Sequence, residues 1–293
     1  MAIDESAVLG QFIPLHYHYH MLTDESRMAP FAEAIALVVR PGMRVVDLGA
    51  GTGVLSFFAA RAGAGVVWSV EANPELAAAA RQNLDRNGVG DRVRVVDADA
   101  AQYVPPEPVD VVICEMLHTG LLREKQIDVL RGFKRHYLEA HGPPLPRFVP
   151  EGYVQAVQLV EQDWTYAGYA AEFAHFQHPS VEQTRTNELA EPAVYDSGLY
   201  EGDLPEVIRW DGVTTTARAG RLNALRFITK NLVAIVESER RSVDWLNSYM
   251  IVPLAAAVDV AAGQGVRVAF AYPPGSPLDA LRPAVELTSG SYE

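Results

Sequence analysis

The stretch Val45-Val-Asp-Leu-Gly-Ala-Gly-Thr-Gly53 decides the fold of this chain. A β-branched, apolar run from Met43 to Leu48 predicts a strand, and the alanine-rich segment 54–62 that follows predicts a helix. Three alternating glycines join the two and let the backbone pass close to a ligand. In open α/β sheets, ligands bind at such a carboxyl end of a strand. The stretch therefore predicts a ligand site inside an α/β domain.

The first half of the sequence alternates between strand-like and helix-like segments. Such alternation favours βαβ units, and hence a Rossmann-like parallel sheet with helices on both faces. A helix at 31–39 ends before Pro41-Gly42 and precedes the first strand. The further predicted strands are 66–70, 92–96 and 109–114, and the predicted helices between them are 54–62 and 74–87.

The pattern changes after Pro143-Pro144-Leu145-Pro146. From there strand-like runs follow one another without helices, which is typical of an antiparallel sandwich or barrel. We expect two domains, 1–146 for ligand binding and 147–293 as a β-barrel-like domain. An irregular stretch at about 164–203 is expected to be an insertion, with helix as one option. The predicted strands of the second domain are 153–161, 226–237, 245–252 and 266–272.

The composition restricts the classes of partner. The 293 residues carry a formal net charge of −13, which argues against a nucleic-acid partner and suits a cationic substrate. Apolar runs fall short of the roughly 20 residues that span a bilayer, so no membrane association is expected. One cysteine, Cys114, excludes an intrachain disulfide. We expect a cytoplasmic protein.

The glycine spacing separates two classes of ligand. Gly-x-Gly-x-x-Gly would cradle a pyrophosphate, but here Gly49, Gly51 and Gly53 alternate. Asp47 precedes them, and its negative charge would repel phosphate but suit the ammonium of an amino-acid group. The alternative is a tight strand-to-helix turn without a ligand.

Two further acids follow predicted strands. Glu71 closes the second strand, where an acid accepts hydrogen bonds from ribose hydroxyls in this architecture. Asp99 follows the third strand and could accept from the amino group of adenine, and Asp97 has similar chemistry. Either acid could instead be a solvated loop residue.

From Val45 to Asn73 the sequence resembles the class I S-adenosylmethionine-dependent methyltransferases. The resemblance implies S-adenosylmethionine as cofactor. It also implies a role for each residue of the motif: the methionine part held by Asp47, Gly49, Gly51 and Gly53, the ribose by Glu71, and the adenine by Asp99.

Two glutamates, Glu115 and Glu124, lie nine residues apart after the fourth strand. A guanidinium offers five donors in a planar fork, so a pair of carboxylates could orient it and leave one nitrogen free to react. One glutamate with a raised pKa could also accept the departing proton. Taken alone, such glutamates are more often a solvated loop residue and a helix-start acid.

This loop resembles the double-glutamate loop of the protein arginine methyltransferases. A second resemblance is His18-x-x-Met-Leu-x-Asp-x-x-Arg27, which looks like the lid helix that this family folds over its cofactor. It implies that Arg27 binds the methionine carboxylate and that His18 contacts the cofactor. Alternatively, Arg27 is a cation on the helix surface, and His18 is one of several aromatic side chains in this segment. We expect Glu115 and Glu124 to be catalytic. His16, His18 and His20 could suggest a metal site, because an extended segment would place all three on one side. No acid or cysteine cluster accompanies them, so we expect no metal.

The family's threonine-histidine-tryptophan loop corresponds to Val243-Asp244-Trp245, so an aspartate replaces the histidine. The expected tyrosines before His18 are missing, and Phe12 is nearest. Phe12, Asp244 and Trp245 are the candidate substrate-binding residues. The resemblance implies a homodimer through the insertion at 164–203.

The leading functional hypothesis is transfer of a methyl group to the guanidino group of arginine, in a protein, a peptide or the free amino acid. The alternative acceptor is a hydroxyl or amine of a specialised metabolite. A non-enzymatic scaffold that binds the cofactor is the third reading, against which the intact acids argue.

Overall fold

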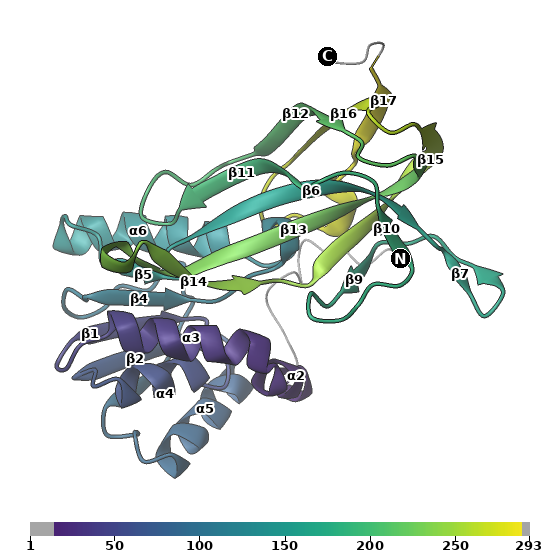
Figure 1. Cartoon of the computed structure of the whole chain (residues 1–293). Coiled ribbons are helices and arrows are strands. Elements are labelled where there is room, and N and C mark those ends of the chain that lie inside the picture. Colours follow the sequence, from purple (N-terminus) through teal and green to yellow (C-terminus); the bar gives the residue numbers. More distant parts are fainter. Residues whose placement is uncertain (1–14, 289–293) are drawn as a thin grey trace, which may run out of the picture.

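A computed structural model describes residues 15–288, in which a half built on a parallel sheet adjoins a half built on antiparallel sheets (Figure 1). Among these residues, no helix combines the length and the apolar character needed to cross a membrane.

The parallel sheet has the strand order β3-β2-β1-β4-β5. The order reverses between β1 and β4, so the connections leave their carboxyl ends in opposite directions and open a crevice there. This edge of the sheet carries the glycine loop after β1 and Glu115 after β4. The strands are β1 (Arg44–Leu48), β2 (Val66–Glu71), β3 (Val93–Asp97), β4 (Val111–Cys114) and β5 (Arg147–Val149).

The strand and helix positions expected for this half agree with the structure to within a few residues. The exception is the helix expected at 31–39, which begins earlier, because Asp24 caps it by accepting from the backbone N–H of Arg27. The helices are η1 (Leu15–Tyr17), α2 (His18–Thr23), α3 (Glu25–Val38), α4 (Val54–Arg61), α5 (Pro74–Arg86), η2 (Thr119–Leu121) and α6 (Gln126–His141).

The chain leaves the parallel sheet at β5, which pairs with β4. The domain boundary expected after residue 146 thus falls just before a short strand of the first half. Only from Gly152 does the chain enter the antiparallel half.

The antiparallel half centres on three long strands, β6 (Gly152–Gln162), β13 (Gly220–Val236) and β15 (Tyr249–Val260). They belong to a seven-stranded sheet with β9, β10, β11 and β14, while β12, β16 and β17 form a second sheet and β7 and β8 a hairpin. The remaining bounds are β7 (Thr165–Tyr166), β8 (Tyr169–Ala170), β9 (His175–Gln177), β10 (Thr186–Glu188), β11 (Ala193–Leu199), β12 (Ile208–Thr215), η3 (Glu237–Glu239), β14 (Arg241–Leu246), β16 (Gly265–Tyr272), η4 (Leu278–Ala280) and β17 (Ala284–Leu287).

Two expectations for this half were wrong. The insertion at 164–203 contains strands β7 to β11 and no helix, because its backbone pairs with β6 and β15. The strand expected at 245–252 is interrupted at Asn247-Ser248, where the chain turns from β14 into β15. In both places tertiary pairing decides what local periodicity could not.

Aromatic side chains hold the two antiparallel sheets together. The ring of Phe270 on β16 packs edge-on against Tyr195 on β11 and Phe227 on β13, with ring centroids 5.0 and 5.3 Å apart. Edge-to-face contacts at these distances are the favoured aromatic geometry. This packing confirms the expected combination of a Rossmann-like sheet with a sandwich or barrel.

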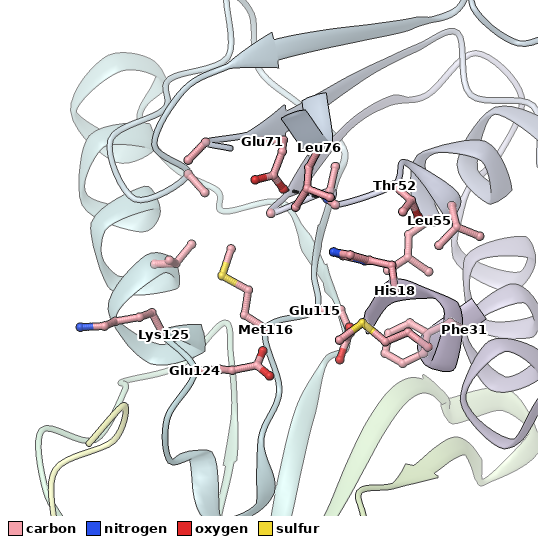
Figure 2. A pocket seen from close by; sticks show the side chains of 18 of the residues that line it. His18, Phe31, Thr52, Leu55, Glu71, Leu76, Glu115, Met116, Glu124 and Lys125 are labelled. Atoms are coloured by element: carbon pink, nitrogen blue, oxygen red, sulfur yellow. Dashed lines mark hydrogen bonds between the residues drawn. The ribbon is translucent and has the colours of Figure 1, made fainter. Parts of the chain in front are cut away.

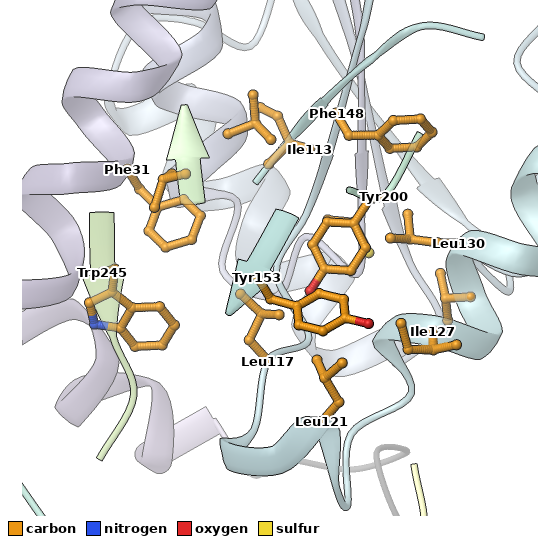
Figure 3. Packing of buried hydrophobic residues seen from close by; sticks show 14 of the residues in the cluster. Phe31, Ile113, Leu117, Leu121, Ile127, Leu130, Phe148, Tyr153, Tyr200 and Trp245 are labelled. Atoms are coloured by element: carbon orange, nitrogen blue, oxygen red, sulfur yellow. The ribbon is translucent and has the colours of Figure 1, made fainter. Parts of the chain in front are cut away.

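The two halves share a continuous apolar core. Figure 3 shows the rings of Tyr153 and Tyr200 beside Leu117 and Leu121, and the two ring centroids lie 5.6 Å apart. Leu117 and Leu121 belong to the segment between Glu115 and Glu124, so this segment lies at the junction of the halves.

Candidate active site

A cavity of about 460 Å³ opens at the carboxyl edge of the parallel sheet. Ligand pockets are typically of this size. Figure 2 shows Glu71 across the cavity from Glu115 and Glu124, with His18 at one side. The lining includes His18, Met21, Arg27, Met28, Phe31, Gly49, Gly51, Glu71, Leu76, Asp99, Glu115, Met116, Glu124, Lys125 and Val129.

Glu71 organises the glycine loop. Its two carboxylate oxygens accept from the backbone N–H groups of Gly51 and Asn73, each at 2.8 Å. Gly51 has φ +55°, and a Cβ there would lie 2.8 Å from Cε1 of His18. Glycine is therefore required where the loop meets α2.

Asp47 and Gly53 lie outside the lining of the cavity. The Asp47 carboxylate is buried and accepts from the Ser56 hydroxyl at 2.7 Å, and burial raises its pKa to about 7 against the opposing effect of Ser56. Gly53, at φ +84°, is the N-cap of α4. The structure thus places Asp47 in β1 and Gly53 at the N-cap of α4, on either side of the glycine loop, and their contact with the methionine part stays a prediction.

His18 presents a buried nitrogen to the cavity. Its Nε2 has no hydrogen-bond partner among the described residues, and burial lowers its pKa, so the ring is neutral near pH 7. His16 and His20 are exposed, because the segment is helical rather than extended as the shared-side argument assumed. Residues 15–288 contain no cluster of metal-ligating side chains.

The two acids considered after the third strand occupy different places. Asp99 lines the cavity and accepts from the backbone N–H of Ala101 at 2.9 Å. Asp97 lies outside it and pairs with Arg81 at 2.8 Å. The geometry thus favours Asp99 over Asp97 as the ligand-facing acid.

Glu115, Glu124 and Arg27 meet at one end of the cavity. Glu115 forms an ion pair with Arg27. Burial raises the pKa of both glutamates, and that of Glu124 reaches about 7 because the charge of Glu115 adds to burial. Two buried carboxyl groups with one arginine leave a site that favours a further cation.

Trp245 supports Arg27 from outside the cavity. Its ring lies 5.5 Å from the guanidinium carbon of Arg27 and packs edge-on against Phe31. Asp244 also lies outside the lining and pairs with Lys230 at 2.6 Å. The structure thus shows neither Asp244 nor Trp245 facing the cavity, and Phe12 lies outside the described residues.

Sequence reasoning missed Gln126, the first residue of α6. This buried side chain donates to the backbone oxygen of Cys114 at 2.8 Å and accepts from the N–H of Met116 at 2.9 Å. It thereby fixes the backbone around Glu115. No short-range pattern marks a glutamine for this role, and only its proximity to Glu124 could have drawn attention to it.

The groups around the cavity fit S-adenosylmethionine. Arg27 offers a cation for a carboxylate, Glu71 offers acceptors for hydroxyls, and Asp99 lies beside apolar side chains suited to a base. The unpartnered nitrogen of His18 and the close approach at Gly51 are also features of a ligand cradle.

Comparisons with known proteins agree with this geometry. A methyltransferase-domain family matches residues 45–139. A protein of Methanothermobacter thermautotrophicus of uncharacterised function is 33% identical over 271 residues, which cover 92% of this chain and 97% of the relative. The arginine N(omega)-methyltransferase of Streptomyces achromogenes is 34% identical over 134 residues, which cover 44% of this chain and 37% of that enzyme.

The fold has a counterpart among solved structures. The Trypanosoma brucei PRMT1 enzyme-prozyme heterotetrameric complex, determined with S-adenosylhomocysteine (AdoHcy), superposes with a TM-score of 0.71 at 15% identity, covering 97% of this chain and 99% of the other. The chain therefore belongs to the class I S-adenosylmethionine-dependent methyltransferases, and its fold resembles that of the protein arginine methyltransferases.

Proposed function

We propose that the protein transfers a methyl group from S-adenosylmethionine to a guanidino nitrogen of arginine. The observation that carries this proposal is that the partly buried carboxyl groups of Glu115 and Glu124 lie together at one end of the cofactor cavity. The Streptomyces relative, an arginine N(omega)-methyltransferase, supports it.

Each cofactor contact is assigned from the lining of the cavity. Arg27 binds the methionine carboxylate, Glu71 the ribose hydroxyls and Asp99 the adenine amino group. His18 closes over the loop at Gly51, and the missing side chain of Gly49 leaves room for Met116, which also lines the cavity. Asp47 and Gly53 act indirectly, by holding the turn. The bound cofactor supplies a methyl group on a sulfonium, which is the electrophile.

Glu115 and Glu124 position the acceptor. Their carboxylates hold a guanidinium by charge-assisted hydrogen bonds, so that one nitrogen faces the methyl carbon. The nitrogen–carbon bond forms as the carbon–sulfur bond breaks, giving methylarginine, S-adenosylhomocysteine and a proton. Glu124, with a pKa of about 7, takes that proton. Arg27 contacts Glu115 and so links the two binding ends.

The acceptor is arginine in a protein, in a peptide or as the free amino acid. The two carboxyl groups favour a cation over a neutral hydroxyl, because Arg27 pairs with Glu115 and a neutral acceptor would supply no cation for Glu124. Of the candidate acceptor-binding residues Phe12, Asp244 and Trp245, Trp245 acts indirectly, because its ring supports Arg27.

We also propose a cytoplasmic homodimer. Apolar rings are exposed on the insertion, at Tyr169 (74%) and Phe173 (52%), and on the first helices, at Tyr17 (55%) and Tyr19 (66%). Such surfaces favour association through the insertion. The only cysteine, Cys114, is buried and free, which suits a reducing compartment. Light scattering of a variant lacking residues 177–190 tests the dimer.

The proposed activity is tested with labelled S-adenosylmethionine and a panel of free arginine, arginine peptides and metabolite amines, read by mass spectrometry. We expect methylation of an arginine compound. Glu124→Gln should lower kcat at least about 100-fold, because guanidinium alignment and proton acceptance are both lost. The affinity for S-adenosylhomocysteine should stay within about threefold.

The matched control is Glu139→Gln, which changes an exposed acid near the end of α6. It should turn over like the unaltered protein. Methylation of amines or hydroxyls alone, or a Glu124→Gln variant as active as the control, would contradict the proposal.

A further inference from the structure

We propose that Thr229 and Asn247, both in the antiparallel half, are positioning residues that hold the double-glutamate loop, residues 115–124, in its reactive shape. The inference rests on the proposed function, because it concerns the same two glutamates. Neither side chain lines the cavity.

The backbone of the loop needs support. Gly120, Leu121 and Arg123 have φ values of +72°, +54° and +61°. The left-handed region is unfavourable for residues with a Cβ and persists only where surrounding contacts impose it. The surroundings of the loop therefore decide where Glu115 and Glu124 point.

The first support is a chain of hydrogen bonds from Gln155 on β6. The Thr229 hydroxyl donates to Oε1 of Gln155 at 3.2 Å and accepts from the backbone N–H of Gly120 at 2.8 Å. Because Gln155 takes the hydroxyl proton, an oxygen lone pair of Thr229 is left for Gly120. Thr229 is fully buried, so water cannot replace this bond.

The second support runs in parallel from Asn231 on β13. Its Nδ2 donates to Oδ1 of Asn247 at 2.7 Å, and Nδ2 of Asn247 donates to the backbone oxygen of Leu117 at 3.2 Å. Asn231 thus fixes which way the Asn247 amide faces. The two supports thus bind the backbone of the loop at Leu117 and at Gly120.

Backbone contacts from the same half continue along the loop. The Thr119 hydroxyl donates to the oxygen of Ser248 at 2.6 Å, and the N–H of Gly275 donates to the oxygen of Leu121 at 2.7 Å. The N–H of Arg123 donates to the oxygen of Ser276 at 2.8 Å. Acceptor geometry therefore depends on the antiparallel half.

The decisive experiment compares Thr229→Val with Thr186→Val. Val keeps the shape of Thr and removes the hydroxyl. Thr186 is a close match, because its buried hydroxyl also donates to a glutamine side-chain oxygen, that of Gln162, and accepts from an amide nitrogen, Nε2 of the Gln177 side chain. It lies away from the loop. We expect Thr229→Val to lower kcat about 10- to 100-fold, as small misplacement of reacting groups does.

Three further readouts separate positioning from general damage. The affinity for S-adenosylhomocysteine should stay within about threefold in Thr229→Val. Thr229→Ser should restore kcat, because it restores the hydroxyl. Hydrogen exchange of the Gly120 amide should accelerate in Thr229→Val and not in Thr186→Val, since only the former loses the acceptor of that amide.

Asn247→Asp provides a second variant should Thr229→Val fail to fold. It keeps the acceptor for Asn231 and removes the donor to Leu117, so kcat should also fall. Equal losses of kcat in Thr229→Val and Thr186→Val, or unchanged Gly120 exchange, would overturn the positioning role. If the protein methylates no arginine compound, the proposed function fails, whereas Gly120 exchange still tests the support of the loop.

Discussion

The two ends of the cavity are built differently. At the cofactor end, the glycine loop is held by Glu71, twenty residues away in sequence and on the neighbouring strand. At the acceptor end, the double-glutamate loop is held by Thr229 and Asn247, more than one hundred residues away and in the other half of the molecule.

This difference indicates how the two functions are separable. The proposed cofactor contacts all come from the first half, between His18 and Asp99, whose parts are close in sequence. The loop proposed to align the acceptor is held by hydrogen bonds between the two halves. Changes in the antiparallel half can therefore alter the acceptor step while leaving cofactor binding intact. Such a separation allows one fold to serve enzymes with different acceptors.

The largest effect is expected at Arg27, which belongs to both ends. Arg27→Gln removes the cation that pairs with Glu115 and that is proposed to bind the methionine carboxylate, so kcat/KM should fall about 100- to 1,000-fold. Cofactor affinity should fall as well. Steady-state kinetics and calorimetry measure the two effects.

The control for Arg27 is Arg241→Gln, which breaks an exposed pair with Glu33 on the same helix, α3. Ion pairs on the surface contribute little to stability, so kcat/KM and the cofactor affinity should both be unchanged. If Arg27→Gln lowers kcat/KM but leaves the cofactor affinity unchanged, Arg27 does not bind the cofactor. The cofactor end and the acceptor end would then share no residue.

A smaller effect, confined to the cofactor end, is expected for Gly51→Ala. The new Cβ would sit 2.8 Å from the His18 ring at a φ of +55°, so the lid is displaced and the affinity for S-adenosylhomocysteine falls about tenfold. Gly88→Ala is the matched control, because Gly88 has φ +69° but open space around its Cβ position. Calorimetry on both variants separates steric displacement from backbone strain, and equal affinities would exclude the lid contact.

The smallest effect on binding is expected for Asp47→Asn. Asn can still accept from Ser56, so the affinity for S-adenosylhomocysteine should change less than about threefold. An affinity loss of about 100-fold would instead show that the Asp47 charge contacts the cofactor.

The same variant has a pH signature. The pKa of Asp47 is about 7 in the folded protein and near 4 when unfolded, so the folded state binds more protons between these values. Its contribution to the free energy of unfolding is present below pH 4 and is lost as pH rises to 7. Asp47→Asn should flatten that decline, as denaturant titrations at several pH values would show.

Sequence reasoning was strongest where chemistry and chain are local. The glycine loop, Glu71 and the strand-helix alternation follow from short-range patterns, because turn, strand and helix preferences act over a few residues. It was weaker in the insertion and at Asn247-Ser248, where pairing with distant strands sets the conformation. It could choose between Asp97 and Asp99 only by analogy.

By itself the sequence determined a class I methyltransferase domain followed by an antiparallel half, and it singled out the paired glutamates. Only the tertiary structure decided that Asp47 faces Ser56, that Trp245 supports Arg27, and that Thr229 and Asn247 grip the acceptor loop. The physical reason is that these contacts join residues that are separated in sequence and meet only in the folded chain. A buried polar group without a hydrogen-bond partner costs free energy, so the folded chain supplies that partner.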